Sequence, residues 1–571
     1  MNIYRSVVCL GIFAAVCLAG PRNAYAQQHV AEDKPYKQEL AAVESKLRTG
    51  NIAGAIESLD QVIAKYPEAA EVHYAKALLF GQARNFEVAI PLAEKAFELE
   101  PKNLLFANYL VELHKGNGDL PGALPVVDKV IEAYPDNSSL YREKIMLLHA
   151  NRQSEAALQT YDTTVSRFGK TDTLDVIKAE ILVDLDRKEE AETTLMPWFR
   201  ENSGIRQVYS TLGYLYLDKK NVKQAIQVLD RGLKNTNDNL LYLDLADAYT
   251  ADKKDKLAFD ALKKAFDATD VNYADKQRVM FTLLSGRSTF TLDQIQDLAN
   301  TLVLKHPRIA DSHVAKGDVL WRRGNLQEAR SLFLTAIGIN RNHVDAWRML
   351  MNVELALNDA DQAISHGFEA LEANPNNPIL LYFTGLAYMV KDDTDNARKM
   401  METALDNSGH ENNYLQSLIY AGLGDLYHKL KMVEVSDVAY EEAIKLDSTN
   451  ATAMNNYAYY LSERNEKLEL AEELSRKSNE LDPASSTFQD TYAWVLFKQE
   501  KYKEALQWME KAIKGANPSA VLYEHYGDIL SKVGNRKEAV RQWEKALAAS
   551  EGSGIDVEKL KTKITTRDYV E

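Results

Sequence analysis

Apolar side chains recur at helical spacing along almost the whole chain. In one typical stretch, Ala258, Leu262 and Ala265 are separated by four and three residues, and polar residues fill most positions between them. Residues at i, i+4 and i+7 share one face of an α-helix, so this pattern predicts amphipathic helices. Two stripes of about 14 residues fit into each successive segment, and turns such as Arg323-Gly324-Asn325 separate them.

The pattern repeats with a period close to 34 residues. Three segments end in Pro67, Pro101 and Pro135, and an alanine stands 12 residues before each proline. That position is occupied in turn by Ala55, Ala89, Ala123, Ala157, Ala191, Ala225, Ala258, Ile295, Ala329, Ala363, Ala397, Ser436, Ala471, Ala505 and Ala539. A fixed period of this length is typical of solenoids, in which one helical hairpin cannot bury its apolar face alone and neighbours stack.

A second small residue recurs 12 positions before the alanine in many units. It is found at Ala77, Ala179, Gly213, Ala246, Gly317, Gly385, Gly424, Ala493 and Gly527. We expect the two small positions to let the helices of a hairpin approach closely, since a larger side chain there would overpack at a cost of about 1–3 kcal/mol. The prolines should end the second helix, because proline cannot continue its hydrogen bonding.

Spacing and residue types resemble the tetratricopeptide repeat family. Good copies run from Trp347 through Ala363 to Pro375, and from Tyr492 through Ala505 to Ala512. The resemblance implies an all-α, right-handed superhelical solenoid of about 15 stacked helix-turn-helix units, with a concave groove lined by the first helices. It is specific for the fold but nearly silent on function, because the family's defining residues are packing residues.

The predicted organisation follows from the repeat phase. Residues 36–272 hold units one to seven, 273–553 hold units eight to fifteen, and 554–571 form a capping helix and tail. Within the second group, 273–307 diverges, with Ile295 at the alanine position. This segment is interpreted either as a joint between the two groups or as a diverged unit that packs normally, and the second interpretation is favoured.

Residues 1–26 have the three regions of a secretory signal peptide, and 27–35 form a short segment before the repeats. Arg5 precedes an apolar run from Ser6 to Gly20, and Ala24-Tyr25-Ala26 supplies a small-x-small cleavage site. A membrane span needs about 20 apolar residues, so this run is short for one. No lipobox is present, because Pro21 stands where cysteine would be needed. We therefore expect a cleaved Sec signal and an exported protein of the bacterial periplasm or envelope.

Charge and cysteine content narrow the chemistry further. The chain has 68 Lys and Arg against 83 Asp and Glu, a net charge of −15, which argues against nucleic-acid partners. Its two cysteines, Cys9 and Cys17, lie in the segment expected to be removed, so no disulfide is expected. The sequence shows no phosphate loop, nucleophile elbow or His-Glu-x-x-His pair. We expect no catalytic residues, cofactor, metal or membrane span in the mature protein, and no enzyme activity.

Positions two, five, six, nine and twelve of a first helix face the groove in this family. They place nine polar or aromatic residues in a predicted partner-binding groove: Tyr74, Arg142, Tyr214, Arg348, Asn352, Tyr382, Asn455, Asn456 and Trp494. Arg and aromatic side chains anchor protein interfaces disproportionately, although Tyr and Trp at helical spacing are more often core residues. The Lys and Asn set with which some family members clamp a C-terminal carboxylate is not in register here.

These observations predict a non-enzymatic scaffold or adaptor that binds peptides or helices of a partner protein along the groove. The alternative is a regulatory or substrate-presenting subunit of an envelope enzyme or of a secretion or assembly complex. Self-association into a structural rod is a third hypothesis that the sequence leaves open.

Overall fold

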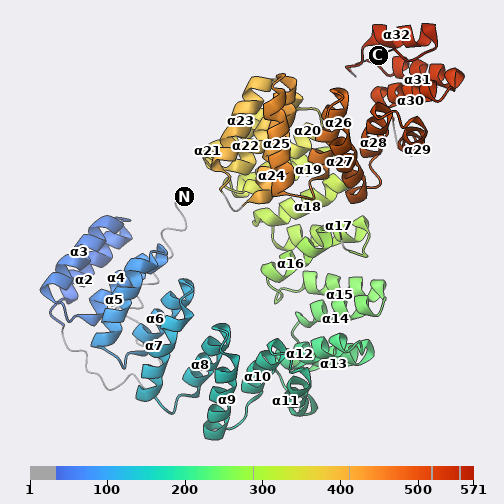
Figure 1. Cartoon of the computed structure of the whole chain (residues 1–571). Helices are drawn as coiled ribbons and strands as arrows, with labels where there is room; N and C mark the ends of the chain where they lie inside the picture. Colours follow the sequence, from blue (N-terminus) through green and yellow to red (C-terminus); the bar gives the residue numbers. More distant parts are fainter. Residues whose placement is uncertain (1–33, 287, 410–411, 516–517, 552–553, 571) are drawn as a thin grey trace. The chain divides into compact units, whose positions relative to one another are not determined.

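The computed structural model describes residues 34–286, 288–409, 412–515, 518–551 and 554–570. All regular secondary structure in these ranges is α-helical, with 31 helices and no strand (Figure 1). The all-α stack of helical hairpins expected from the repeat is confirmed. The expected signal peptide, residues 1–26, lies outside the described residues.

The chain divides into two compact units, and the division falls between Asp270 and Val271. Unit 1 holds the following helices: α2 (Lys37–Arg48), α3 (Ile52–Lys65), α4 (Ala70–Gln82), α5 (Phe86–Leu99), α6 (Leu104–Gly116), α7 (Leu120–Ala133), α8 (Ser138–Ala150), α9 (Ser154–Phe168), α10 (Asp172–Asp184), α11 (Lys188–Arg200), α12 (Arg206–Asp218), α13 (Val222–Thr236), α14 (Leu241–Ala251) and α15 (Asp255–Asp267).

Unit 2 continues the same alternation of first and second helices. It holds α16 (Tyr273–Leu284), α17 (Leu292–Lys305), α18 (Ala310–Arg322), α19 (Leu326–Ile339), α20 (Val344–Ala356), α21 (Ala360–Ala373), α22 (Pro378–Val390), α23 (Thr394–Asn407), α24 (Asn413–Lys429), α25 (Val433–Leu446), α26 (Ala451–Glu463), α27 (Leu468–Leu481), α28 (Ser486–Lys498), α29 (Tyr502–Ala512), α30 (Ala520–Lys532), α31 (Arg536–Ala548) and α32 (Val557–Thr566).

Local sequence explains where the helices begin and end. Asn51 and Asp119 cap α3 and α7, each accepting a hydrogen bond from the backbone N–H three residues on, at 2.9 and 3.0 Å. The turn from α18 to α19 uses Gly324, whose φ of +80° is the left-handed conformation that favours glycine. Pro67 and Pro101 each follow the last residue of a second helix by two positions, as the sequence predicts.

The two small positions of a unit bring its helices together. The alanines of the repeat phase are fully buried, and the glycines of the first helices lie against bulky side chains of the second. A Cβ on Gly213 would lie 2.8 Å from Leu229 Cδ2, and one on Gly424 would lie 2.8 Å from the ring of Tyr440. In the hairpins whose first helix carries a glycine at this position, that glycine faces a large side chain four positions after the repeat residue.

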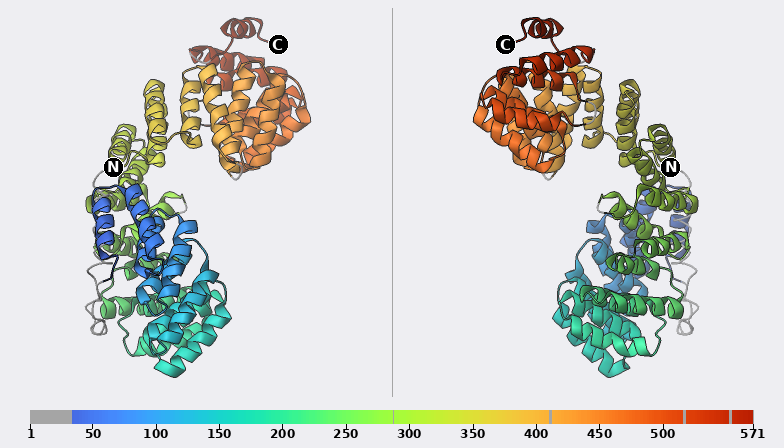
Figure 2. Two further views of the ribbon diagram at one scale, coloured as in Figure 1. Left: turned by 90° about the vertical axis from the view of Figure 1, so that its left-hand side faces the viewer. Right: turned by 90° about the vertical axis from the view of Figure 1, so that its right-hand side faces the viewer.

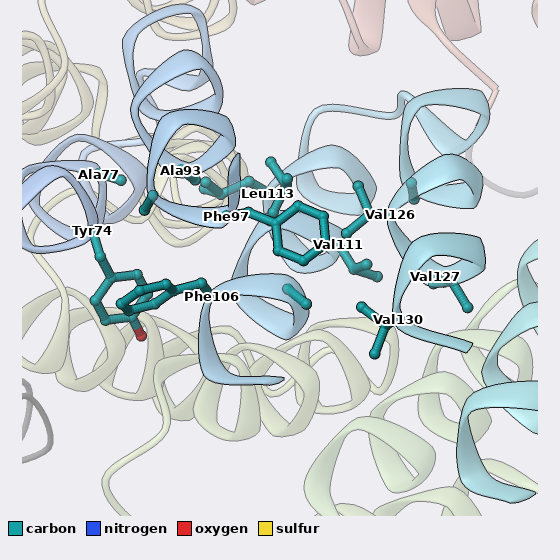
Figure 3. Packing of buried hydrophobic residues seen from close by; sticks show 14 of the residues in the cluster. Tyr74, Ala77, Ala93, Phe97, Phe106, Val111, Leu113, Val126, Val127 and Val130 are labelled. Carbon is teal, nitrogen blue, oxygen red and sulfur yellow. The ribbon is translucent and has the colours of Figure 1, made fainter. Parts of the chain in front are cut away.

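Neighbouring hairpins share continuous apolar cores. In unit 1, the ring of Tyr74 on α4 lies 4.8 Å from that of Phe106 on α6, and Val127 and Val130 extend the same core on α7 (Figure 3). Consecutive helices within each unit lie side by side in successive views (Figure 1 and Figure 2). Stacking thus buries the apolar face that a single hairpin would expose.

The divergent hairpin and the C-terminal cap differ from this pattern in informative ways. Among the described residues, α16 and α17 form the hairpin whose two helices contact each other least, and Ile295 at the alanine position is buried. At the other end, α32 packs on α31 through Leu560, and the Lys563 ammonium lies 2.7 Å from carboxylate oxygens of Glu524 and Asp528. No helix among the described residues has the length and apolar content needed to cross a membrane.

Candidate functional site

All nine predicted groove residues lie on first helices, but the structure does not gather the three in unit 1. Tyr74 belongs to the hydrophobic core, whereas Tyr214 on α12 is 50% exposed. Arg142 on α8 lines a cleft of about 510 Å³ with Asn108 and Glu112 of α6. These residues lie on separate hairpins and do not form one site.

Two predicted residues in unit 2 lie on α20. The Arg348 side chain is half-buried and pairs with Asp345 of its own helix at 3.1 Å, and Asn352 lies one turn further along, also half-buried. Neither lines the clefts described next.

The other four predicted residues fall on α22 (Tyr382), α26 (Asn455 and Asn456) and α28 (Trp494). Two neighbouring clefts lie in this part of unit 2, and of the four residues Asn455 and Asn456 line them, whereas Tyr382 and Trp494 do not. The first cleft, of about 510 Å³, is lined by side chains of α22 to α24 and α26. The second, of about 400 Å³, lies between α26, α28 and the start of α30. Asn456 and Tyr460 line both. The two clefts therefore lie next to each other and share a wall formed by the first helix α26.

The carboxylate of Asp425 on α24 lies in the wall of the first cleft. Its Oδ1 accepts hydrogen bonds from the hydroxyls of Tyr440 and Tyr460, the latter at 3.1 Å, and from Asn456 Nδ2 at 3.2 Å. Burial raises the pKa of Asp425, and these hydrogen bonds oppose that rise. Burial also raises the pKa of the nearby Tyr382 hydroxyl to about 12. This carboxylate is held by neutral donors in a half-buried position.

An aromatic pair borders the same carboxylate. The ring of His428 stacks on that of Tyr460 with centroids 3.7 Å apart, and both line the first cleft. Burial lowers the pKa of His428, and the positive charge of Arg464 lowers it further. Both effects favour the neutral form of His428, and its Nδ1 has no hydrogen-bond partner within the described residues.

Asn455 gives the second cleft an unsatisfied acceptor. Its side chain is only 3% exposed, its Nδ2 donates to Asn456 Oδ1 at 3.2 Å, and its Oδ1 has no partner among the described residues. A buried polar atom without a hydrogen bond costs about 1–3 kcal/mol. Asn455 lines the cleft, but its Oδ1 is closed off from solvent, so a ligand donor would remove this cost only if the side chain turned towards the cleft.

Trp494 does not line the second cleft; it lies behind Asp490, a residue of the cleft wall, within a polar and aromatic stack. Its indole N–H donates to Glu463 Oε1 at 2.7 Å, and its ring lies 4.0 Å from that of His525. Burial alone would lower the pKa of His525, but the Asp490 carboxylate, 3.0 Å from His525 Nδ1, raises it overall. Trp494 is largely buried, so it supports the cleft wall more than it offers free surface.

The side chains that line these clefts define the chemistry available there. Among the described residues, no group of His, Cys, Asp and Glu side chains has a geometry that could hold a metal ion. The polar groups present are amides, phenols, aliphatic hydroxyls, carboxylates, one imidazole and the Lys429 ammonium. Such groups recognise peptide backbone and side chains.

Comparison with known proteins identifies the repeat. Sequence patterns described as tetratricopeptide repeats match residues 40–103, 74–138 and 296–344, residues 424–551, and residues 207–239. Together these matches cover more than half of the chain. The chain belongs to the tetratricopeptide repeat family. Both clefts of unit 2 lie largely within the matched range 424–551.

Individual relatives of this repeat protein are distant. The human protein O-mannosyl-transferase TMTC3 is 24% identical over 197 residues, which are 32% of this chain and 20% of that protein. The chain thus spans about a fifth of that curated relative.

Two solved structures can be aligned with the chain. The crystal structure of the APC/C hetero-tetramer Cut9-Hcn1 covers 81% of this chain and 96% of its own at 12% identity and a TM-score of 0.37. A tetratricopeptide repeat protein from Parabacteroides merdae covers 45% of this chain and 98% of its own at 18% identity and a TM-score of 0.34.

Sequence reasoning missed most residues of the clefts, among them Asp425, Tyr459, Tyr460, His428 and Asp490. A signal for the first two exists in the tetratricopeptide register. Asp425 and Tyr459 directly follow the small first-helix residues Gly424 and Ala458, the same position that Tyr214 and Trp494 hold in their units.

Proposed function

We propose that this tetratricopeptide repeat protein is a non-enzymatic scaffold or adaptor that binds a segment of a partner protein across the first helices of unit 2. The observation that carries the proposal is the Asn455 Oδ1 atom, buried in a cleft wall without a hydrogen bond. A backbone N–H of a bound segment is the donor it lacks.

The surroundings of Asn455 suit an extended peptide. The two neighbouring clefts are lined by residues from α22 to α30, so several consecutive residues of a ligand can contact them. Tyrosine side chains such as Tyr459 and Tyr460 add large contact area at low cost in conformational entropy. Because the stacked hairpins hold these groups in place before binding, little ordering is required of the protein.

The setting of this activity is part of the proposal. The signal-peptide pattern of residues 1–26 supports export to a bacterial periplasm or envelope, where the mature chain acts without a cofactor or metal. Fractionation of cells, with N-terminal sequencing of the protein, tests this: we expect a chain that begins at Gln27 in the envelope fraction. A cytoplasmic chain that retains its first residues would contradict export.

The alternative role is a regulatory or substrate-presenting subunit of an envelope enzyme. The same clefts would then hold a segment of the enzyme or of its substrate. Co-purification of an activity in fixed stoichiometry, lost when the cleft is altered, separates this role from that of a passive scaffold.

Photo-crosslinking in cells tests the binding surface. A benzoylphenylalanine replacing Thr487, an exposed residue that lines the second cleft, should crosslink to a partner. The matched control is the same replacement at the exposed Lys477 on the second helix α27. A partner captured at Thr487 and absent at Lys477 is the expected result. Equal capture at both positions, or capture at Lys477 alone, would contradict a first-helix binding surface.

A further inference from the structure

Three first helices of unit 2 carry an aspartate at the same repeat position, directly after the small glycine. These are Asp318 after Gly317, Asp425 after Gly424 and Asp528 after Gly527. At each glycine the first helix lies close to the second helix of its own hairpin, since an added Cβ would meet Phe333, Tyr440 or Trp543 respectively. The aspartate that follows the glycine is therefore held close to the second helix as well. The three carboxylates can therefore be compared as equivalent positions.

The chain supplies a cation to two of the three. Asp318 accepts from the guanidinium of Arg322, one turn on in α18, at 3.0 and 3.3 Å. Asp528 accepts from the buried ammonium of Lys563 on the capping helix at 2.7 Å. In each case a positive charge compensates a carboxylate that the fold withdraws from water.

Asp425 is the exception. The residue one turn on is Lys429, but its ammonium pairs with Asp392 instead. Within the described ranges, the hydrogen bonds to Asp425 come from Tyr440, Tyr460 and Asn456, and no Lys or Arg pairs with it. Its Oδ2 receives only a long contact of 3.4 Å from Asn456 Nδ2.

The remaining basic groups nearby are also committed. Arg464 holds Asp437 at 2.8 Å and Glu466 at 2.9 Å. Burial and the charge of Arg464 favour the neutral form of His428, as described above. The first cleft, about 510 Å³ in volume, opens onto Asp425 between these groups, and this size is within the usual range for ligand pockets.

We propose that the first cleft receives the lysine or arginine side chain of a bound peptide, whose cation pairs with Asp425 while the peptide backbone reaches Asn455. The inference rests on the proposed function and specifies its ligand. Asn456 bridges the two contacts, because it donates to Asp425 and accepts from Asn455. The rings of Tyr460 and His428 add an aromatic face for the cation, an interaction worth more when the pair is shielded from water.

The test selects peptides and then removes the carboxylate. A random heptapeptide phage library is panned on the purified full chain, and the best selected heptapeptide is labelled with fluorescein and titrated by polarisation. We expect Lys or Arg enrichment at one position, and at least a tenfold loss of affinity when that residue becomes norleucine. Asp425→Asn should cause a similar loss, because it removes the carboxylate that pairs with the cation. A tenfold loss corresponds to about 1.4 kcal/mol.

Two further variants make the result specific. Asp318→Asn is the matched control, because its carboxylate already has Arg322, and it should leave affinity unchanged. Thr394→Lys at the cleft wall should reproduce the loss without removing any hydrogen bond of Asp425, which guards against misfolding of Asp425→Asn. Circular dichroism confirms that each variant is folded.

The outcomes separate this inference from the proposed function. Selected peptides that lose affinity on Asn456→Ala but need no basic residue, or that are insensitive to both Asp425→Asn and Thr394→Lys, would overturn the cation site and leave the peptide cleft standing. Recovery of no binding peptide, or of peptides insensitive to Asn456→Ala as well, would overturn both.

Discussion

The pairing of a small first-helix residue with a large second-helix residue yields a sharp stability prediction at Gly213. An added Cβ would lie 2.8 and 2.9 Å from Leu229 Cδ2 and Cγ, so Gly213→Ala should overpack the hairpin. Overpacking costs about 1–3 kcal/mol. The better helix propensity of alanine returns about 1 kcal/mol. We expect net destabilisation of α12 and α13 by up to about 2 kcal/mol.

The chain offers a matched control and a compensating change. Gly338, near the end of α19, has no atom within 4 Å of an added Cβ, so Gly338→Ala should stabilise by up to about 1 kcal/mol. Leu229→Ala alone leaves a cavity and should cost about 2–5 kcal/mol. Combined with Gly213→Ala, it should cost less than the sum of the two single changes, because the clash partner is gone.

Hydrogen exchange with mass spectrometry measures these changes hairpin by hairpin, which suits a repeat protein that need not unfold in one step. Protection of α12 and α13 should fall in Gly213→Ala. In the double variant, the loss of protection should be smaller than the sum of the losses in the two single variants. Equal stabilisation by Gly213→Ala and Gly338→Ala would refute the close approach of the two helices.

Further predictions concern charge. Lys563→Met should lower the free energy of opening that hydrogen exchange measures for α32 by about 3–5 kcal/mol, because it leaves Asp528 and Glu524 without their cation. Unchanged protection of α32 would contradict this. A hydrogen bond to buried Glu354 raises the pKa of His366 in the folded protein. The contribution of this pair to folding stability is therefore complete below the pKa of the unfolded state, near 6.5, and is lost as the pH rises through the pKa of the folded state. Thermal stability should therefore fall from pH 6 to 9, and His366→Gln should flatten that slope. Burial raises the pKa of Asp425 despite its hydrogen bonds. The selected basic peptide should therefore begin to lose affinity, as the pH falls, at pH values above the ordinary pKa range of Asp. Lys429, His428 and Tyr460 line the same cleft, and the charge of Arg464 acts on His428, so Asp425→Asn should abolish this pH dependence if the carboxyl is its origin.

The fold could be predicted almost completely from the sequence because packing in a solenoid is local. The phase of Ala55 through Ala539 marks buried helix contacts, and glycines such as Gly213 mark where a large side chain lies opposite. The site was harder to predict. Tyr74 and Trp494 have the residue types of a groove, yet both are largely buried, because an aromatic side chain at helical spacing serves a core equally well.

Asp425 could not be recognised as unusual from its position alone. Asp318 and Asp528 share that position, and the difference lies in the cations that reach them: Arg322 one turn away, and Lys563 from a distant helix. The direction that Lys429 takes, towards Asp392, depends on the neighbouring hairpin and is visible only in three dimensions. Likewise, the unsatisfied Oδ1 of Asn455 is a property of its surroundings.

The central claim is that the first helices of unit 2 bind a partner segment, and a footprint tests it most directly. Hydrogen exchange of the purified chain is compared with and without a saturating selected heptapeptide. The account predicts new protection concentrated in α24, α26 and α28, with second helices α25, α27 and α29 little changed. Protection confined to second helices or to unit 1, with none on α24, α26 and α28, would contradict it.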